Sequence, residues 1–137
     1  MQQLFSFFLE HWLLSAAFLL LTGAYIMLES LQALPSVSNL ELTRMANQDG
    51  ALILDIRGTA DFRQGHITGS RNLPYADLST QMSSLDAYKD KPVVVVCMRG
   101  QTAVAAGHQL RQAGFSKVYK LAHGIHGWTQ DQLPLIS

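Results

Sequence analysis

An uncharged apolar run near the start of the chain is the feature that most restricts how this sequence can fold. Residues 12–28, WLLSAAFLLLTGAYIML, contain no charged side chain. As a helix the run would extend roughly 25 Å, close to the thickness of the hydrocarbon core of a bilayer. It is apolar on all sides and lacks the polar stripe of a helix that packs on a soluble core. We therefore expect one transmembrane helix within residues 1–34, which the apolar residues of segment 4–9 could lengthen.

A cleaved signal peptide is the alternative interpretation of this run. Such a peptide starts with a basic segment, whereas Met1-Gln2-Gln3 offers only the terminal amine. Basic residues tend to stay on the cytoplasmic side of a span, and Arg44 is the nearest one, which weakly favours a cytoplasmic C-terminal part. The lone Cys97 excludes an intramolecular disulfide and agrees with a reducing compartment.

The charge distribution argues against nucleic acid as a partner. Residues 1–43 contain no Lys or Arg and three acids, and residues 44–137 contain ten bases and seven acids. The small basic excess of the second part is scattered along the chain, without the basic stripe that would bind a phosphate backbone.

Residues 35–137 have the pattern of a separate α/β domain. Pro35 disfavours helix at Leu34, and Ser38 or Asn39 can cap the helix that follows. Short apolar runs then alternate with helical patterns, which is typical of βαβ units around a mostly parallel sheet with helices on both faces. We predict strands over 51–54, 93–96 and 118–121, an extended piece within 65–74, and helices over 59–64, 75–88 and 102–113. The four valines of 93–96 predict the central strand.

The candidate reactive group is Cys97, which directly follows this central strand. The carboxyl ends of parallel strands are where open α/β sheets bind ligands. The loop Cys97-Met98-Arg99-Gly100-Gln101-Thr102 contains a glycine and leads into a helix, so its amides can turn toward the sulfur. The helix N-terminus and Arg99 would both favour the thiolate over the thiol. A buried, inert cysteine is the alternative, but it would not need this polar turn beside it.

Spacing separates three chemistries that use a thiolate in such a loop. A thioredoxin-type reductase needs a second cysteine three residues later, where Gly100 stands. A cysteine phosphatase needs an arginine six residues after the nucleophile, where Ala103 stands. Transfer of sulfane sulfur remains, because a persulfide on Cys97 needs little beyond the inward-facing amides.

The loop resembles the six-residue active loop of the rhodaneses, which are thiosulfate and related sulfurtransferases. Further family landmarks follow one another in order, from residue 36 to the end of the chain: Asp55-Ile56-Arg57, Asp61-Phe62, Gly65-His66-Ile67-Thr68-Gly69-Ser70, Asn72-Leu73-Pro74 and Leu121–Trp128. The last stretch normally contains two adjacent glycines, and His123 replaces the first of them. The resemblance identifies residues 35–137 as a rhodanese-like three-layer domain.

The resemblance implies a role for each residue of the loop. Cys97 would carry the persulfide, the amides of Met98, Arg99, Gly100, Gln101 and Thr102 would bind it, and Arg99 and Arg57 would guide an anionic donor. The partners implied are a small anionic sulfur donor, a thiol acceptor on a small molecule or a protein (or cyanide), and the membrane. No cofactor is implied. Membrane-anchored single-domain rhodaneses are a bacterial arrangement, so the expected location is the inner membrane, crossed once, with the domain in the cytoplasm.

A non-catalytic adaptor is the alternative function. Rhodanese-like domains that lack the cysteine act as binding modules, and such a domain would hold a partner at the membrane. The presence of Cys97 favours the enzyme.

Other polar residues of the domain have structural interpretations. Asp55 is expected to accept backbone N–H groups, Thr102 to cap the helix that follows the loop, and His66 to fix a turn. His123 and His126 are three residues apart, but no cysteine or carboxylate cluster adjoins them, and we expect no metal site.

Overall fold

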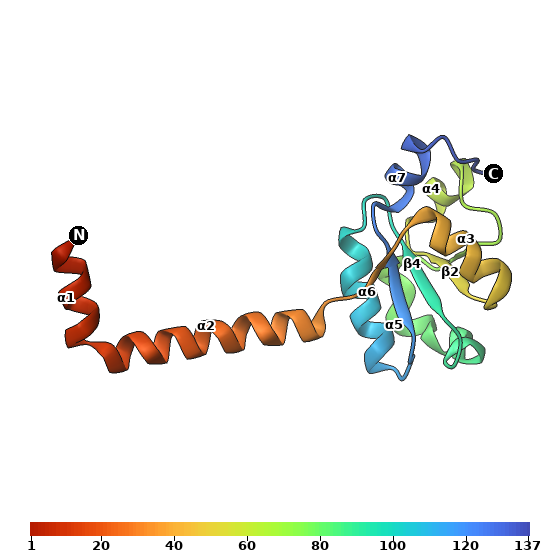
Figure 1. Cartoon of the computed structure of the whole chain (residues 1–137). Helices are drawn as coiled ribbons and strands as arrows, with labels where there is room; N and C mark the ends of the chain where they lie inside the picture. Colours follow the sequence, from red (N-terminus) through yellow and green to blue (C-terminus); the bar gives the residue numbers. More distant parts are fainter. The chain divides into compact units, whose positions relative to one another are not determined.

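A computed structural model describes residues 1–137, with the exception of the side chain of Gln32. The chain divides into two compact units, Met1–Ala33 and Leu34–Ser137. The first is entirely helical, and the second is an α/β domain (Figure 1).

The N-terminal unit consists of two helices, α1 (Gln2–Glu10) and α2 (Trp12–Gln32). They are separated at His11, whose φ of −114° and ψ of 39° break the helix, and the two helices run in clearly different directions (Figure 1). Residues 4–9 therefore do not lengthen the long apolar helix, a possibility that the sequence leaves open. Segment Trp12–Leu31 has a mean hydropathy of 1.7 and no buried residue, and is long and apolar enough to cross a membrane as an anchor or to act as a signal sequence.

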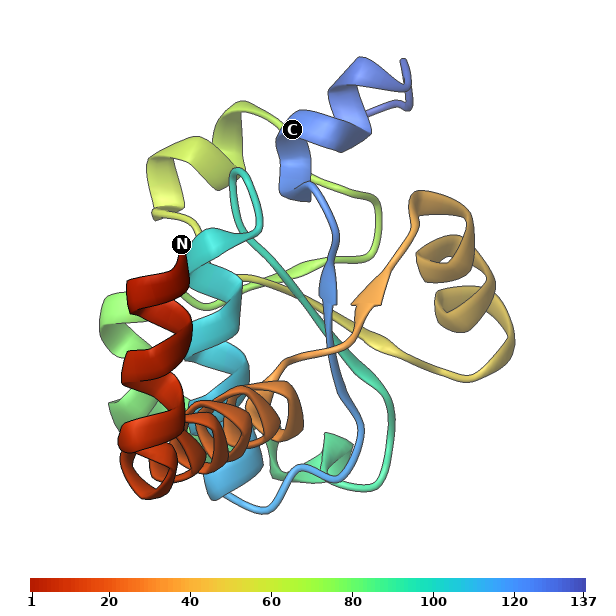
Figure 2. The same cartoon turned by 60° about the vertical axis from the view of Figure 1, so that its left-hand side comes forward.

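The C-terminal unit is built on a five-stranded sheet. The strands are β1 (Ser36–Val37), β2 (Leu52–Asp55), β3 (Arg71–Asn72), β4 (Val93–Val96) and β5 (Val118–Leu121), in the spatial order β1-β5-β4-β2-β3. All four neighbouring pairs are parallel. The valine run forms the central strand β4, as predicted. Figure 2 shows the strands crossing the middle of this unit.

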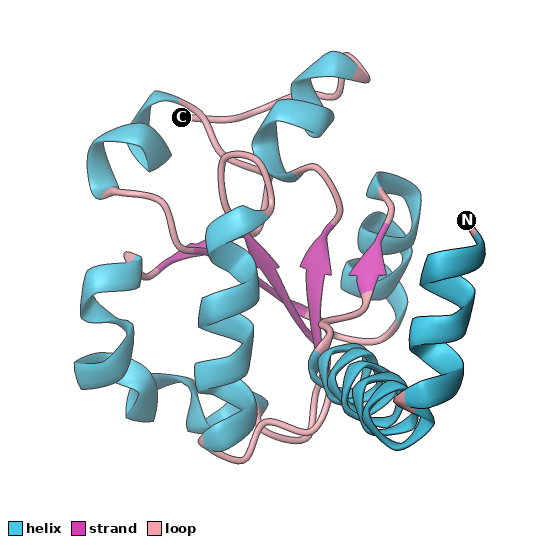
Figure 3. Cartoon of the chain, turned by 90° about the vertical axis from the view of Figure 1, so that its left-hand side faces the viewer, coloured by secondary structure: helices cyan, strands magenta, loops and turns pink.

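Helices cover both faces of this sheet, which gives three layers (Figure 3). One face packs against α6 (Gln101–Gln112), α5 (Leu78–Gln81) and the 3-10 helix η2 (Met82–Tyr88). The other face packs against α3 (Asn39–Gln48) and α7 (Gly124–Gln130). The short helix α4 (Thr59–Gln64) follows β2. The predicted mostly parallel α/β domain with helices on both faces is confirmed.

Alternation along β4 decides which way Cys97 points. Val93 and Val95 lie in the core layer on the α6 side, and Val94 and Val96 lie in the layer on the α3 side. Successive side chains of a strand point to opposite faces, so Cys97 continues the set that faces α6.

The predicted helix over 75–88 is broken into three short pieces. They are the 3-10 helix η1 (Tyr75–Asp77), the single turn α5, and η2. The hydroxyl of Thr80 donates to the Asp77 carbonyl and that of Ser84 to the Gln81 carbonyl. Such local bonds occur in regular helices of this chain as well, so they do not by themselves explain the interruption. Its apolar residues Leu78 and Leu85 are nevertheless buried, as a helical pattern requires.

The helix boundaries otherwise follow the sequence signals closely. Helix α3 starts with a capping box, in which the Ser38 hydroxyl accepts from the Glu41 amide and the Glu41 carboxylate accepts from the Ser38 amide. Helix α6 starts at Gln101, one residue before the predicted start, and β2 includes Asp55 as its last residue.

Candidate functional site

The candidate site is the loop that joins β4 to α6. Cys97 is the first residue after β4, and only 5% of its surface is exposed. Because β4 is the central strand, its carboxyl end has neighbouring strands on both sides, β2 and β5. The sulfur thus lies at the edge of the sheet where ligands bind in folds of this kind, nearly enclosed by protein.

A backbone amide of the loop is directed at the sulfur. Gly100 adopts a left-handed conformation, with φ of 92°, and its N–H donates to the Cys97 Sγ over 2.9 Å. A Cβ on Gly100 would stand 2.9 Å from the Ala122 carbonyl oxygen, so both the conformation and the space require glycine. Gly100 is also the N-cap of α6, which places the positive end of this twelve-residue helix beside the sulfur.

The first turn of α7 holds the opposite side of the loop. The Ile125 amide donates to the Cys97 carbonyl and the His126 amide to the Met98 carbonyl, each over 2.9 Å. In a trans peptide the following N–H points away from the carbonyl, and the chain contains no cis bond among the described residues. The amides of Met98 and Arg99 are therefore turned away from α7.

Close packing at Gly124 fixes this contact. Gly124 has φ of 58°, and a Cβ there would overlap the Cys97 carbonyl oxygen and stand 2.8 Å from the Met98 carbonyl oxygen. His123 precedes it with φ of −118°, a conformation open to any residue. Position 123, where histidine replaces a family glycine, therefore does not require glycine. Position 124 does require glycine, and Gly124 stands there.

The remaining loop residues expected at the site are exposed. Met98 is 46% exposed, and Arg99, Gln101 and Thr102 are exposed as well. Among the described contacts, the sulfur accepts a hydrogen bond from Gly100 and not from these exposed residues. Thr102 is the second residue of α6 and does not cap it, because the glycine before Gln101 occupies the N-cap position.

Arg57 lies in a buried ion pair next to the site. Its Nη2 is 2.8 Å from the Asp55 Oδ2 and donates to the Gly65 carbonyl over 2.7 Å, and its Nε donates to the Asp55 Oδ1. Asp55 also accepts from the Arg57 amide, which confirms the expected interaction with a backbone N–H. Two of the three guanidinium nitrogens are thus bound within the protein, whereas Arg99 is exposed.

Asn72 is a positioning residue that sequence reasoning did not single out. Its side-chain amide donates to the carbonyls of Asp55 and Arg57, over 3.1 and 3.0 Å. The intervening Ile56 amide donates to the carbonyl of Val96, the residue before Cys97. The segment that follows β2 is therefore tied to the end of β4. The signal in the sequence is the Asn72-Leu73-Pro74 motif, to which the resemblance alone assigns no role.

One of the candidate histidines, His66, is held by contacts within the domain. The His66 ring stacks on Phe62 with 3.8 Å between ring centroids, and its Nδ1 is 2.8 Å from the Phe62 carbonyl oxygen. The His66 backbone forms an antiparallel bridge with Ile136. His123 and His126 are exposed. Among the described residues, no group of three His, Cys, Asp or Glu side chains is arranged to hold a metal ion.

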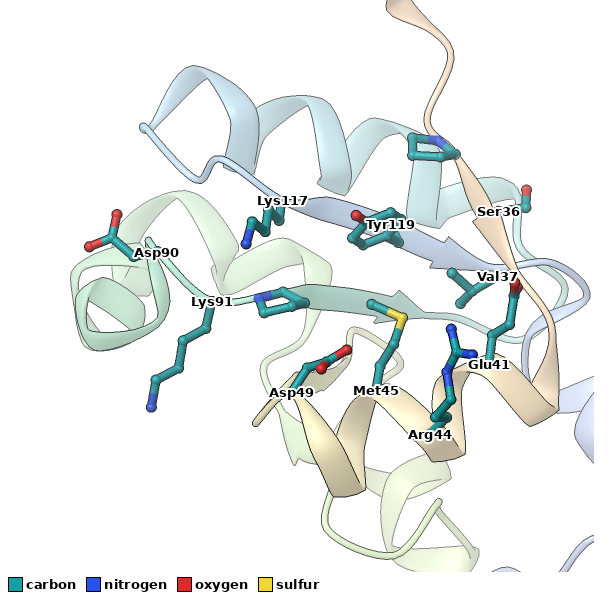
Figure 4. Close-up of a pocket in the computed structure, with 12 residues that line it drawn as sticks. Ser36, Val37, Glu41, Arg44, Met45, Asp49, Asp90, Lys91, Lys117 and Tyr119 are labelled. Carbon is teal, nitrogen blue, oxygen red and sulfur yellow. The ribbon is translucent and has the colours of Figure 1, made fainter.

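An open pocket of about 630 Å³ lies elsewhere, at the amino ends of β4 and β5. Figure 4 shows α3 side chains on one wall and residues that precede the two strands on the other. Its charged lining residues are Glu41, Arg44, Asp49, Asp90, Lys91 and Lys117. Cys97 stands at the other end of β4, so this pocket is not part of the candidate site.

Comparisons with known proteins agree with this fold. The model of the rhodanese-like domain family matches residues 38–131. Uncharacterized protein YibN of Escherichia coli K12 is 35% identical over 141 aligned positions, which cover 99% of this chain and 98% of that protein. Thiosulfate sulfurtransferase GlpE of Pseudomonas aeruginosa is 36% identical over 88 positions, covering 64% of this chain and 78% of that protein. A rhodanese-related protein of Thermoplasma volcanium superposes with a TM-score of 0.67 at 25% identity, covering 74% of this chain and 97% of that one.

Proposed function

Because the chain belongs to the rhodanese-like domain family, we propose that it is a sulfurtransferase that carries sulfane sulfur as a persulfide on Cys97. The observation that supports this most is the Gly100 amide, which donates to the Cys97 Sγ at the N-terminus of α6. A hydrogen bond and a helix terminus both stabilise negative charge on sulfur. The match to a relative named as a thiosulfate sulfurtransferase supports the same activity.

The reaction proceeds in two displacements on sulfur. The Cys97 thiolate attacks the outer sulfur of thiosulfate, the S–S bond of the donor breaks, and sulfite leaves with the bonding electron pair. The product is a persulfide on Cys97. A thiolate or cyanide then attacks the outer sulfur of this persulfide, and the Cys97 thiolate leaves unchanged. A thiol acceptor becomes a persulfide, and cyanide becomes thiocyanate.

The loop supplies the binding groups for this chemistry. In this proposal the Gly100 amide, which donates to the Cys97 Sγ, binds the persulfide anion together with the other amides of Met98 to Thr102. The carbonyls of Cys97 and Met98 accept from α7 instead. Arg99 attracts the anionic donor. Arg57 is neutralised by Asp55 in the buried pair, so it holds the neighbouring segment in place and does not attract the donor.

The enclosure of Cys97 restricts the substrates. With 5% of its surface exposed, the residue admits the terminal sulfur of a small anion but not a bulky group. We therefore assign a small anionic donor, and an acceptor thiol that stands at the end of a slender group, on a small molecule or on an extended protein segment. The reaction as written needs no cofactor.

The apolar helix α2 serves as a membrane anchor in this proposal. Residues 1–34 form the anchor segment and residues 35–137 the rhodanese-like domain, with Leu34 itself packed in the domain core. The proposed location is the inner membrane of a bacterium, crossed once, with the domain in the cytoplasm. This proposal takes α2 as retained rather than cleaved, because segment Trp12–Leu31 is long and apolar enough to span a membrane.

The test uses the full chain in detergent, incubated with thiosulfate and examined by intact mass spectrometry. We expect an increment of one sulfur atom that maps to Cys97, disappears on addition of cyanide with release of thiocyanate, and is absent in Cys97→Ser. If the wild type and Cys97→Ser were equally inactive and neither gained mass, the adaptor function would replace the enzymatic one.

A further inference from the structure

The short helix α1 has its polar and apolar side chains on opposite sides. At 100° per residue, the polar side chains of Gln2, Gln3, Ser6 and Glu10 fall within one arc of the helix. The remaining surface carries Leu4, Phe5, Phe7, Phe8 and Leu9, all of them more than half exposed. No residue of α1 is buried.

The bend at His11 turns this apolar face toward α2. Phe7 and Phe8 of α1 and Leu14, Phe18 and Leu19 of α2 line one apolar cleft of about 400 Å³ at the inside of the bend. The Phe7 ring also contacts the His11 ring, with 4.8 Å between centroids. The apolar side of α1 therefore faces the side on which α2 extends.

Helix length shows why α1 does not continue into the bilayer. The 21 residues of α2 extend about 32 Å, which already matches the hydrocarbon core. A continuous helix that also included α1 and His11 would be about 15 Å longer than this. Because the helix breaks at His11, the residues of α1 can run in a different direction from α2.

We propose that α1 lies in the membrane–water interface, on the side of the bilayer opposite the rhodanese-like domain, with the side chains of Leu4, Phe5, Phe7, Phe8 and Leu9 inserted among the lipids. This inference rests on the anchor part of the proposed function. A lipid surface covers the apolar face of α1 for two reasons. One residue joins α1 to the spanning helix, and the apolar face of α1 points along that helix into the bilayer. The Gln2, Gln3, Ser6 and Glu10 side chains face water, and Trp12 starts the span at headgroup depth, where its ring is favoured.

The test measures the depth of single labels in the full chain, reconstituted in vesicles of phosphatidylcholine and phosphatidylglycerol. A Cys97→Ser background leaves one introduced cysteine for a nitroxide label, placed at Phe8, Ser6 or Leu20. Electron paramagnetic resonance then compares how strongly each label is relaxed by oxygen, which enters lipid, and by a water-soluble nickel chelate. We expect Phe8 to be shielded from nickel at shallow depth, Ser6 to be reached by nickel, and Leu20 to lie in the core.

Three results would overturn the inference while the anchor stands. Equal access of nickel to Phe8 and Ser6 would show α1 in water, and deep burial of both would show a continuous span. Spectral broadening at Phe8 that vanishes on dilution with unlabelled chain would show that a second copy covers the face. A Leu20 label reached by nickel, or an intact mass that lacks the N-terminal residues, would instead overturn the anchor itself.

A matched pair of substitutions tests the role of the apolar face directly. With the label at Leu4, Phe8→Gln should raise nickel access several-fold, because it removes the centre of the inserted face. Gln3→Ser on the polar side should leave nickel access unchanged. A label at Leu20 should not respond to either substitution. Equal responses to Phe8→Gln and Gln3→Ser would contradict insertion through this face.

Discussion

Gly124 lies against the carbonyl group of Cys97, at a point where no side chain fits. Its φ of 58° is one that residues with a Cβ rarely adopt, and the adjacent Ile125 amide donates to that same carbonyl. The residue that carries the proposed reaction is thus positioned from two sides, by the Gly100 amide at its sulfur and by α7 at its backbone.

Gly124→Ala should displace the loop and abolish most sulfur transfer. The new Cβ would overlap the Cys97 carbonyl and force α7 and the loop apart, so the sulfur would lose its alignment with the Gly100 amide. Gly69→Ala is the matched control, because Gly69 also has a positive φ, of 82°, but a methyl group added there would meet nothing within 4 Å. Both variants carry the backbone strain, of about 1–2 kcal/mol. We expect Gly124→Ala to lower the free energy of unfolding by about 2 kcal/mol more than this.

Thermal unfolding and thiocyanate release from the full chain check this prediction. Equal losses of stability in Gly124→Ala and Gly69→Ala would show that α7 yields without cost, and the loop would then not depend on this contact.

Arg99→Gln should weaken the use of thiosulfate without impairing the chemical step. Arg99 is exposed beside Cys97, where a positive charge attracts a dianion before reaction. We expect KM for thiosulfate to rise by about tenfold with kcat nearly unchanged. Lys117→Gln is the control, because it removes a charge at the amino end of β5, whereas Cys97 lies at the carboxyl ends of the strands. It should alter neither KM nor kcat. A fall in kcat at constant KM would show that Arg99 acts on the loop structure instead.

Local signals in the sequence were sufficient to predict the central strand and the position of Cys97 at its carboxyl end. Four consecutive β-branched residues favour a buried strand, and a glycine with polar neighbours after Cys97 favours a turn into a helix. Both features depend on residues adjacent in the chain. The predicted strand 93–96 and the position of Cys97 at its carboxyl end are confirmed.

Contacts between distant segments were not predictable in this way. The amides that hold the loop belong to Ile125 and His126, more than 25 residues after Cys97. No periodic pattern in the sequence predicts these contacts. The 5% exposure of Cys97 is likewise set by the packing of both core layers around β4. The sequence does not predict the helix break at His11, because neither proline nor glycine is present there.

Asp55→Asn should destabilise the domain strongly, because it leaves the Arg57 guanidinium buried without its counter-charge. Asp55 is fully buried and Arg57 is 8% exposed. Removing one partner of a buried pair costs about 3–5 kcal/mol. Asp86→Asn is the matched control: it breaks an exposed pair with Lys89, at 3.4 Å, and should cost less than about 1 kcal/mol. Chemical denaturation followed by tryptophan fluorescence measures both variants, since of the two tryptophans Trp128 is buried in the domain and Trp12 is exposed. Similar losses in the two variants would contradict the buried-pair argument.

Residues 34–137 should fold without the helical segment, and Leu34 should be needed for it. The two core layers of the domain are formed by residues from Leu34 onward. Leu34 is 5% exposed and packs at Gly107, where a Cβ would stand 3.1 Å from the Leu34 Cγ. A chain that starts at Leu34 should melt as a single cooperative unit, and one that starts at Pro35 should be less stable by about 2–4 kcal/mol, because it leaves the Leu34 site empty. Equal melting temperatures for the two truncations would show that Leu34 belongs energetically to the anchor segment and not to the domain.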